Sequence, residues 1–457
     1  MEQFIFWFGT IVFIATYIAI ASEKVHKTVA ALLGASLMMV VILGNFHVNM
    51  GAIPSDAAER FSKLDLFSKY SNFDVIFTLA GMMLLVNILS GTGLFQYVAI
   101  KCAKIAKGSP VRTLILLVFA TAFMSAFLDN VTTILLVAPV TLVVCSQLGV
   151  PVMPFLMAET MASNIGGTAT LIGDPPNLII GNIANLSFGA FLVNLAPFII
   201  IILTIYCIIL WIYYGKKMQV SVEKRALVMD MNENAAITDP VNMKRGGIIM
   251  ALTIVGFLLH SLVHLQPSVV AVTGAAFALL FCKVDVDHSL EKIEWSTLGF
   301  FMALFILVSG AQACGLMAEI GSWLNLFGDA NVLVIVLVIM WLSAIASAVM
   351  NNVSFTAAMA AIVANFVASH SAFKPGLDGK MTPEAELLWW GLALAVCLGG
   401  NGTLVGAAAN LVTAGIAEKA GKKVTFKEFI RYGLPVTFFS MVAASIYVVI
   451  RYFVCCK

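Results

Sequence analysis

The sequence predicts an all-α polytopic membrane protein, and three observations support this fold class. Of the 457 residues, 61% are hydrophobic and only 11% are charged, whereas soluble chains average about 25% charged residues. Apolar runs recur along the whole chain, and a spanning helix needs about 20 such residues. Twelve apolar segments fall into two sets of six with matching lengths, which indicates an internal duplication.

The first repeat is predicted to occupy residues 1–214 and the second residues 245–457, with a polar cytoplasmic linker over 215–244. The apolar segments of the first repeat lie at about 3–22, 28–45, 73–92, 113–148, 152–186 and 188–214. Those of the second repeat lie at about 245–264, 268–282, 296–315, 332–369, 386–420 and 429–454.

Four short motifs of the first repeat recur in the second in the same order. The pairs are Thr28–Gly34 with Ser268–Gly274, Ser90–Leu94 with Gln312–Leu316, Ser125–Thr132 with Ser347–Ser354, and Thr170–Asn177 with Thr403–Asn410. One match could arise by chance, but four in order support a duplication.

The fourth segment of each repeat, 113–148 and 332–369, is too long for one spanning helix. Residues 113–148 as a helix would reach about 54 Å, against roughly 30 Å of hydrocarbon. Polar residues interrupt the segments at Asp129 and Asn351, so we expect a helical hairpin in each. A hairpin returns to the side it entered from. Each repeat then crosses the membrane an odd number of times, and the second repeat is inverted.

The fifth segment of each repeat is predicted to be a broken helix, over 152–186 and 386–420. Ser163–Asn177 holds three glycines, two prolines and a carboxylate, and Gly399–Asn410 is its counterpart. Non-helical backbone at membrane depth is tolerated only where protein buries it or it lines a polar cavity. We therefore expect a binding site, with a water-exposed loop as the alternative. Each repeat then has five transmembrane helices, one re-entrant hairpin and one broken helix.

Basic residues gather in the loops of one side, which the positive-inside rule makes cytoplasmic. This side holds 19 of the 26 lysines and arginines, namely Lys24, Lys27, Lys101, Lys104, Lys107, Arg112, Lys216, Lys217, Lys224, Arg225, Lys244, Arg245, Lys283, Lys292, Lys419, Lys422, Lys423, Lys427 and Arg431. Both termini are then outside, and we expect an integral protein of the plasma or inner membrane. Amphipathic pieces at about 95–107 and 317–328 are expected at the interface.

Three acids stand alone within residues 113–215, which contain no lysine or arginine: Asp129, Glu159 and Asp174. Ionisable residues inside a membrane are costly and mark ion paths or proton relays. With nearby amide and hydroxyl oxygens they suit Na⁺ or a carried proton, so we expect them to couple transport to a cation. Asp129 and Asp174 also fit helix caps, a role compatible with coordination. Glu159 fits a supporting or gating acid.

The second repeat has no such acids, because Asn351 stands in place of Asp129 and Ala407 in place of Asp174. We expect an asymmetric site with its charge in the first repeat. Such a site favours a cation or a neutral polar species over a bare dicarboxylate. The predicted substrate-binding residues are Asn130, Thr132, Asn164, Gly166, Gly167, Thr168, Thr170, Asn177, Asn352, Ser354, Asn401, Thr403 and Asn410.

Other classes of function find little support in the sequence. The six histidines are not spaced as a metal site, and the eight cysteines form no C-x-x-C pair. No phosphate-binding G-x-x-x-x-G-K-[ST] motif occurs, so the chain itself is not an ATPase, while a separate ATPase partner stays open. A net charge of +2 without a dense basic tract argues against nucleic acid. We expect no enzyme activity and no cofactor, with H⁺ or Na⁺ as the coupling ion.

Three motifs resemble the ion transporter superfamily: Ser125–Thr133, Ala162–Asn177 and Gly399–Asn410. Within it, the chain is most similar to the ArsB/NhaD/P-protein group, which shares a citrate-transporter-like domain. That group contains arsenite permeases, NhaD-type sodium/proton antiporters and the melanosomal P protein. The resemblance covers nearly the whole chain. It implies a homodimer with a scaffold and a mobile transport subdomain that holds the hairpins and broken helices and slides like an elevator.

One departure from this pattern bears on the substrate. NhaD-type exchangers resemble Asp-Asn at both hairpin tips, whereas this chain has Asn351-Asn352 at the second tip, in the manner of arsenite permeases. We therefore expect a secondary active transporter in the lipid bilayer that moves a small inorganic ion or oxyacid, with arsenite or antimonite efflux as the leading hypothesis. The alternatives are Na⁺/H⁺ antiport, citrate or dicarboxylate transport and, from another class, an ion channel. Two broken helices favour a transporter, because a channel needs no alternating site.

Overall fold

The structure is a computed structural model that describes residues 2–22, 24–43, 70–324, 331–374 and 380–456. Over these residues the regular structure is entirely helical, so the predicted all-α class is confirmed. Nine of the described helices are long and apolar enough to cross a membrane.

The first repeat contains ten α-helices and one π-helical turn within its described residues. They are α1 (Glu2–Ser22), α2 (Lys27–Leu37), the π-turn η1 (Met38–Leu43), α5 (Phe73–Ser90), α6 (Leu94–Ile105), α7 (Pro110–Ser125), α8 (Asn130–Leu148), α9 (Met153–Gly167), α10 (Pro175–Ile183), α11 (Phe188–Asn194) and α12 (Ala196–Tyr214).

The linker and the second repeat are also helical over their described residues. They contain α13 (Val222–Met229), the 3-10 turn η3 (Glu233–Ala236), α14 (Pro240–Leu259), α15 (Pro267–Cys282), α16 (Val286–Glu291), α17 (Trp295–Ala313), α18 (Leu316–Leu324), α19 (Val332–Val349), α20 (Asn352–Ser369), α21 (Pro383–Gly399), α22 (Ala408–Lys419) and α23 (Phe426–Cys455).

Two element boundaries differ from the sequence prediction. The segment 188–214 divides at Leu195 into α11 and α12, because Pro197 has no N–H to continue the ladder of α11. Helix α14 begins at Pro240, inside the predicted linker. The Asp239 carboxylate caps it by accepting from the backbone amides of Val241 at 3.1 Å and Asn242 at 2.9 Å.

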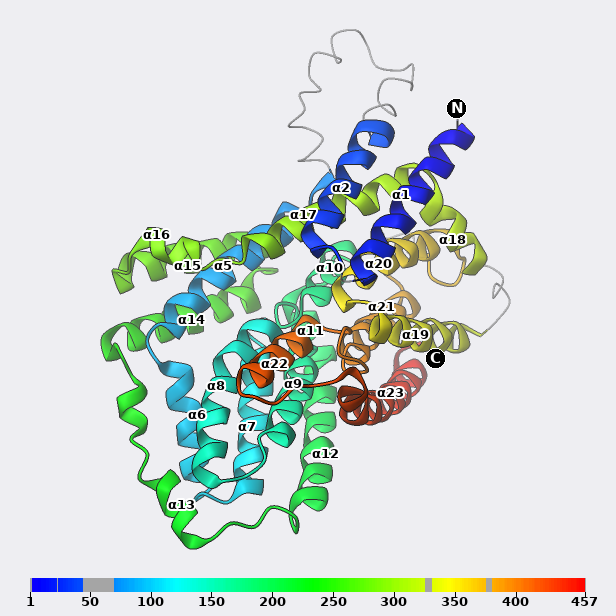
Figure 1. The fold of residues 1–457 in the computed structure, drawn as a ribbon. Coiled ribbons are helices and arrows are strands. Elements are labelled where there is room, and N and C mark those ends of the chain that lie inside the picture. Colours follow the sequence, from blue (N-terminus) through cyan, green and yellow to red (C-terminus); the bar gives the residue numbers. More distant parts are fainter. Residues whose placement is uncertain (1, 23, 44–69, 325–330, 375–379, 457) are drawn as a thin grey trace.

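One group of helices forms a layer that runs diagonally across the upper part of Figure 1. In it α5 packs along α15, α2 packs along α17, and α14 packs against α15. Most of the remaining helices, including both hairpins and both broken helices, lie beneath this layer in Figure 1. The fold therefore separates a layer of spanning helices from a block that holds the candidate site.

The two repeats interlock within that block. Helix α10 of the first repeat packs against α20 of the second, and α22 of the second packs against α8 of the first. Within each repeat the first arms also pair, α7 with α9 and α19 with α21. Each hairpin therefore packs against helices of both broken segments, one from its own repeat and one from the other. This packing brings both hairpin tips close to both breaks.

Equivalent contacts recur in the two repeats. The hydroxyl of Ser125 donates to the Ser163 carbonyl at 2.7 Å, and that of Ser347 donates to the Val396 carbonyl at 2.6 Å. A Cβ added to Gly166 would lie 2.1 Å from the Ala122 carbonyl oxygen, and one added to Gly399 would lie 2.7 Å from that of Ala344. Only glycine allows the hairpin backbone to approach so closely. These pairs support the duplication, while the boundaries 1–214, 215–244 and 245–457 stay predictions.

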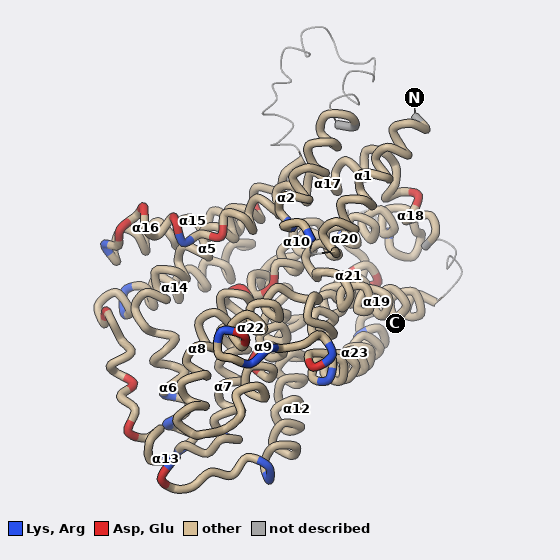
Figure 2. Tube along the Cα trace, viewed as in Figure 1, with Lys and Arg blue, Asp and Glu red and all other residues tan. Residues whose placement is uncertain are grey.

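Charged side chains lie mainly near helix ends and in the linker. Figure 2 shows them around α13, on α16 and near the loop between α22 and α23, whereas α12 and α19 carry none. The linker is held to α6 by Glu233, which pairs with Lys104 and, at 3.2 Å, with Lys101. The hydrogen bond from Lys104 lowers the pKa of Glu233 to about 2.

Candidate substrate and ion site

Each hairpin turns at a capped tip. At the first tip the Asp129 carboxylate accepts from the Thr132 backbone amide at 2.9 Å and from the Thr132 hydroxyl. At the second tip the Asn351 side chain accepts from the Val353 amide at 3.2 Å. The expected capping role of Asp129 is therefore present, and Thr132, which is half-buried, serves the same cap.

In both repeats an asparagine satisfies the carbonyls that the broken helix leaves free. The Asn177 side-chain amide donates to the carbonyls of Gly167 at 3.4 Å, Thr168 at 3.2 Å and Thr170 at 2.9 Å. The Asn410 amide donates to Gly400 and Thr403, both at 2.8 Å. Both donor groups are thus used within the protein, and only the side-chain oxygens of Asn177 and Asn410 face other partners.

Asp174 is completely buried, and its side chain makes no capping hydrogen bond to α10. Its carboxylate instead accepts from Asn130 at 3.3 Å and from Asn352 at 3.4 and 3.3 Å. These two asparagines are the first residues of α8 and α20. The tips of both hairpins therefore converge on a single carboxylate at the first break.

Ala407 occupies the matching place in the second repeat with nearly the same backbone conformation. Its φ and ψ are −141° and 149°, against −140° and 130° at Asp174. The asymmetry between the repeats is consequently one of side-chain chemistry on a shared backbone.

Asn164 lies at the centre of the buried polar network. Its side chain accepts from Asn130 at 3.1 Å and donates to Asn401 at 2.8 Å and to Asn410 at 3.0 Å. The network thus runs from Asp174 through Asn130 and Asn164 to the second break. It links both hairpins and both broken helices through neutral amides and one carboxylate.

The predicted hydroxyl residues mostly bind backbone. Thr170 donates to the Ala126 carbonyl and Thr403 to that of Ala348, so each holds a hairpin tip to its own break. Thr168 donates to the Asn164 carbonyl at 2.8 Å. Ser354 is buried, and its hydroxyl has no hydrogen-bond partner among the described residues.

The paired glycines Gly166 and Gly167 allow close approach of backbone. A Cβ on Gly167 would lie 2.6 Å from the Gly173 carbonyl oxygen, which brings the two ends of the first break together. Their role is therefore to let the chain pack tightly, and they place no side chain in the network.

Glu159 is the predicted site residue that the structure keeps outside this network. It is fully buried on α9, and its carboxyl group accepts a hydrogen bond of 2.6 Å from the Thr141 hydroxyl on α8. Thr141 was not among the predicted site residues, although it is a polar residue within the long apolar segment 113–148.

Cys397 is a further buried residue at the first break that was not among the predicted site residues. Its thiol donates to the Asn177 side-chain oxygen at 3.3 Å. Cys397 is the counterpart of Asn164 at the offset of 233 that relates the two broken helices. Extending the repeat alignment upstream of Gly399 would have pointed to it.

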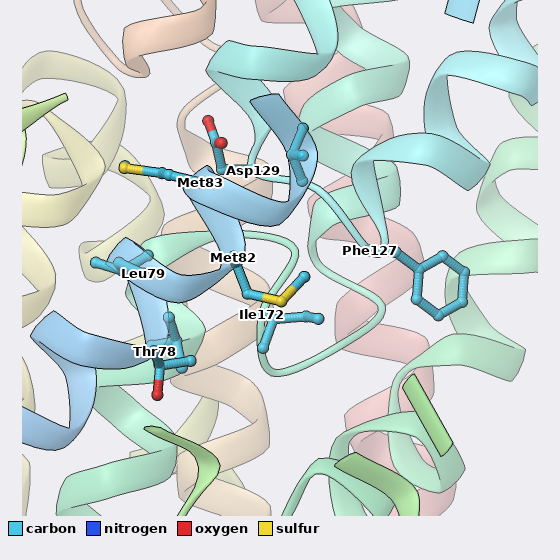
Figure 3. Close-up of a pocket in the computed structure, with 9 residues that line it drawn as sticks. Thr78, Leu79, Met82, Met83, Phe127, Asp129 and Ile172 are labelled. Carbon is cyan, nitrogen blue, oxygen red and sulfur yellow. The ribbon is translucent and has the colours of Figure 1, made fainter. Parts of the chain in front are cut away.

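A small cavity of about 10 Å³ lies between the first hairpin tip, the first break and α5. Figure 3 shows its lining residues, which include Thr78 and Met82 on α5, Asp129 at the tip and Ile172 in the break. Such a volume is about that of one water molecule. A similar cavity of about 20 Å³ lies at the second tip, beside Asn351, Ser354 and Tyr17 of α1. Both tips therefore end at small spaces against helices of the first repeat, α5 at the first tip and α1 at the second.

The arrangement can bind a small cation or polar solute without a basic side chain. Among the described residues, no Lys, Arg or His nitrogen lies within 4 Å of Asp129 or Asp174. Asp129 at the first hairpin tip and Asp174 in the first break are two carboxyl groups of the same repeat, and carboxylates that share a site favour an added positive charge. Within the described residues no cluster of three or more His, Cys, Asp or Glu could hold a metal ion.

Comparisons with known proteins agree on the class of protein. The sequence model of a family described as "Citrate transporter" matches residues 17–395. An uncharacterized transporter of Mycobacterium tuberculosis is 39% identical over 446 residues, covering 97% of this chain and 98% of that protein. The P protein of Sus scrofa is 30% identical over 527 residues, covering 98% of this chain and 59% of that protein.

A solved structure supports the fold alone. The crystal structure of the Alcanivorax borkumensis YdaH transporter, whose title describes an unusual topology, matches with a TM-score of 0.59 at 14% identity. The match covers 94% of this chain and 98% of that one.

Proposed function

The chain belongs to the citrate transporter family and is a secondary transporter of the membrane, and we propose that it couples movement of a small polar solute to a cation at Asp174. The observation that carries this proposal is the convergence of Asn130 and Asn352, one from each hairpin tip, on that buried carboxylate. A ligand that binds there contacts both repeats at once, so its binding changes how the hairpins and the break pack together.

The side chains suit a cation or proton exchanged for a solute. A side-chain amide has a donor end and an acceptor end. With the amides of Asn130 and Asn352 donating, Asp174 is stabilised as a carboxylate in the absence of a cation. When both amides turn, their oxygens and the carboxylate surround a Na⁺ ion with hard ligands. Protonation of Asp174 is the other way to remove its charge, so the coupling ion is H⁺ or Na⁺.

Arsenite or antimonite efflux is the substrate assignment that we favour. The neutral amide and hydroxyl groups of the network suit a small uncharged oxyacid, and the second tip carries Asn351 instead of an acid. Na⁺/H⁺ antiport is the second candidate, supported by Asp129 as a second carboxyl group at the first hairpin tip. Citrate transport is supported by the family description, but the described site offers no basic group for its carboxylates.

We further propose an elevator motion, a homodimer and a cytoplasmic linker with both termini outside. The separation of the α5–α15 and α2–α17 layer from the block of hairpins supports the motion. The basic linker supports the orientation, in a plasma or inner membrane. The elevator motion would carry Asp174 past α5 while the network moves as one unit.

Purified protein reconstituted in liposomes tests the substrate. Arsenite, Na⁺, Li⁺ and citrate are offered in turn under an imposed pH gradient, and proton movement is recorded with a pH-sensitive dye. Arsenite-dependent proton movement supports efflux, and Na⁺- or Li⁺-dependent movement supports antiport. Citrate accumulation would overturn the efflux assignment, and gradient-independent unitary currents would show a channel.

A further inference from the structure

Glu159 is a buried acid that the Asp174 network does not use. Helix α9 carries it toward α8, where the Thr141 hydroxyl lies 2.6 Å from one carboxyl oxygen. The other carboxyl oxygen, Oε2, is buried without a hydrogen-bond partner among the described residues. One acid thus has a single neutral partner in the interior of the block.

No basic group offsets this carboxyl. Among the described residues, no Lys, Arg or His nitrogen lies within 4 Å of Glu159, and the titratable neighbour that faces it is Cys145 on α8. On α12 the titratable groups are tyrosines and Cys207, and on α21 the buried one is Cys397. The charged residues of the helices packed against α9 all lie toward helix ends: Arg112 on α7, Glu384 and Glu386 on α21, Glu418 and Lys419 on α22, and Lys427, Glu428, Arg431 and Arg451 on α23.

A carboxylate in this position would lose its hydration without gaining a cation or a full set of donors. Such a group takes up a proton instead of remaining charged. Glu159 is therefore a protonated carboxylic acid in this conformation. It can ionise only in a conformation that brings water to the seam between α8 and α9.

Helix α8 lacks one of its backbone hydrogen bonds close to Thr141. Pro139 lies within α8, two residues before Thr141, and is exposed. Because proline has no N–H, the carbonyl of Leu135 has no helical donor. A helix that lacks this hydrogen bond bends more easily, and a bend of α8 next to Thr141 would admit water to Glu159.

Glu159 is also connected to the Asp174 network through its own helix. The next residue, Thr160, shares a hydrogen bond of 2.6 Å with Thr413 on α22. Asn164 lies five residues after Glu159 on α9, which is about 7.5 Å along the helix. A change in how α8 and α9 pack at Glu159 therefore reaches the contact between Asn130 and Asn164.

We propose that Glu159 is the site where this transporter takes up and releases its coupled proton, separate from the Asp174 cluster. The proposal rests on the proposed function and refines it, since Asp174 then serves the solute or its accompanying cation. In release, the O–H bond of the carboxyl group breaks, the proton passes to water and the carboxylate remains. Uptake from the opposite side of the membrane reverses this step.

Infrared difference spectroscopy of the purified protein tests the proton site without a substrate. Spectra in acidic and alkaline buffer are compared for the carbonyl stretch of a protonated carboxyl group. We expect a carbonyl band that is absent in Glu159→Gln. In Glu159→Asp the band should lie at a different frequency, and in Thr141→Val it should appear at a different pH. Glu418→Gln, at an exposed glutamate on α22, is the control and leaves it unchanged. A difference spectrum of Glu159→Gln that keeps every carboxyl band of the wild type overturns the proposal.

Transport in liposomes separates this proposal from the general one. With the substrate found among arsenite, Na⁺, Li⁺ and citrate, we expect Glu159→Gln to exchange labelled substrate across the membrane but to lose at least tenfold in proton movement. Asp174→Asn should lose both. Normal proton-coupled transport in Glu159→Gln with loss in Asp174→Asn overturns the Glu159 assignment alone. Normal transport in both variants overturns the proposed function as well.

Discussion

The two adjacent asparagines at the second hairpin tip have different hydrogen-bond partners. Asn351 accepts from the Val353 amide and caps α20, whereas Asn352 is buried and donates to Asp174. From the sequence, both were equally polar residues at one turn. Which of the two faces the carboxylate depends on where α20 begins, and that is set by the cap.

Replacing Asn352 with Ala should therefore weaken cation binding more than a change at Asn351. The change removes the amide oxygen that is proposed to become a ligand of the bound cation, and loss of a polar interaction with a charged group costs about 1.5–3 kcal/mol, or roughly tenfold or more in affinity. The measurement is the concentration of the coupling ion that gives half-maximal transport. Asn351→Ser keeps a capping side chain and serves as the control. Equal effects of the two changes would contradict the assigned roles.

Residue identities predicted most members of the site but not their partners. The three acids and the asparagines stood out because polar groups are rare in apolar segments. Asn177 and Asn410 donate to carbonyls of their own breaks. Asn130 donates to Asp174 within the first repeat, and Asn352 donates to it from the second repeat. The contacts of Asn130 and Asn352 join segments that are far apart in the sequence, so they leave no local pattern in it. The separation of Glu159 from the network has the same cause.

At the scale of elements, the hairpins are held to the broken helices by close backbone crossings. Gly166 and Gly399 occur at matching crossings, where a Cβ would lie 2.1 and 2.7 Å from a hairpin carbonyl oxygen. Apolar length and interrupting polar residues predicted both hairpins. The split between α11 and α12 was missed because Pro197 lies within a continuous apolar run.

Gly166→Ala should destabilise the protein by about 1–3 kcal/mol, because the hairpin backbone must shift to accept a methyl group. Gly415→Ala is the matched control on α22, where a Cβ meets no atom within 4 Å. There the change should be neutral or stabilise by about 0.5–1 kcal/mol. Thermal unfolding in detergent, followed by the loss of monodisperse protein, compares the two. A Gly166→Ala variant as stable as the control would show that the crossing is loose.

The linker should detach from α6 only in strong acid. Pairing with Lys104 lowers the pKa of Glu233 from 4.5 to about 2. The contact is thus fully present above the ordinary pKa and is lost as the pH falls through about 2. Hydrogen exchange of the amides near η3 should rise over this range. Glu233→Gln should remove the pH dependence, and an unchanged profile in that variant would contradict the pairing.

At the scale of the whole molecule, the proposed motion slides the hairpin block along the layer that contains α5. Met82 of α5 and Ile172 of the first break line the same small cavity (Figure 3). They belong to the two parts that the motion would separate. The duplication and the twelve segments were readable from the sequence, but the interlocking of α10 with α20 and of α22 with α8 was not.

A disulfide between Cys residues at positions 82 and 172, made by Met82→Cys and Ile172→Cys, should arrest transport, and reduction should restore it. Each single variant, treated with the same oxidant, is the control and should remain active. Substrate uptake into liposomes before and after oxidation is the measurement. Full activity of the cross-linked protein would contradict a motion between these two parts.

The central claim is that the Asp174 carboxylate, held by one asparagine from each repeat, couples the solute to a cation gradient. The most direct test measures accumulation of the transported species in liposomes under an imposed proton or sodium gradient, in the wild type and in Asp174→Asn of matched stability. We predict uphill accumulation by the wild type and none by Asp174→Asn. Gradient-driven accumulation that persists in Asp174→Asn would contradict this account.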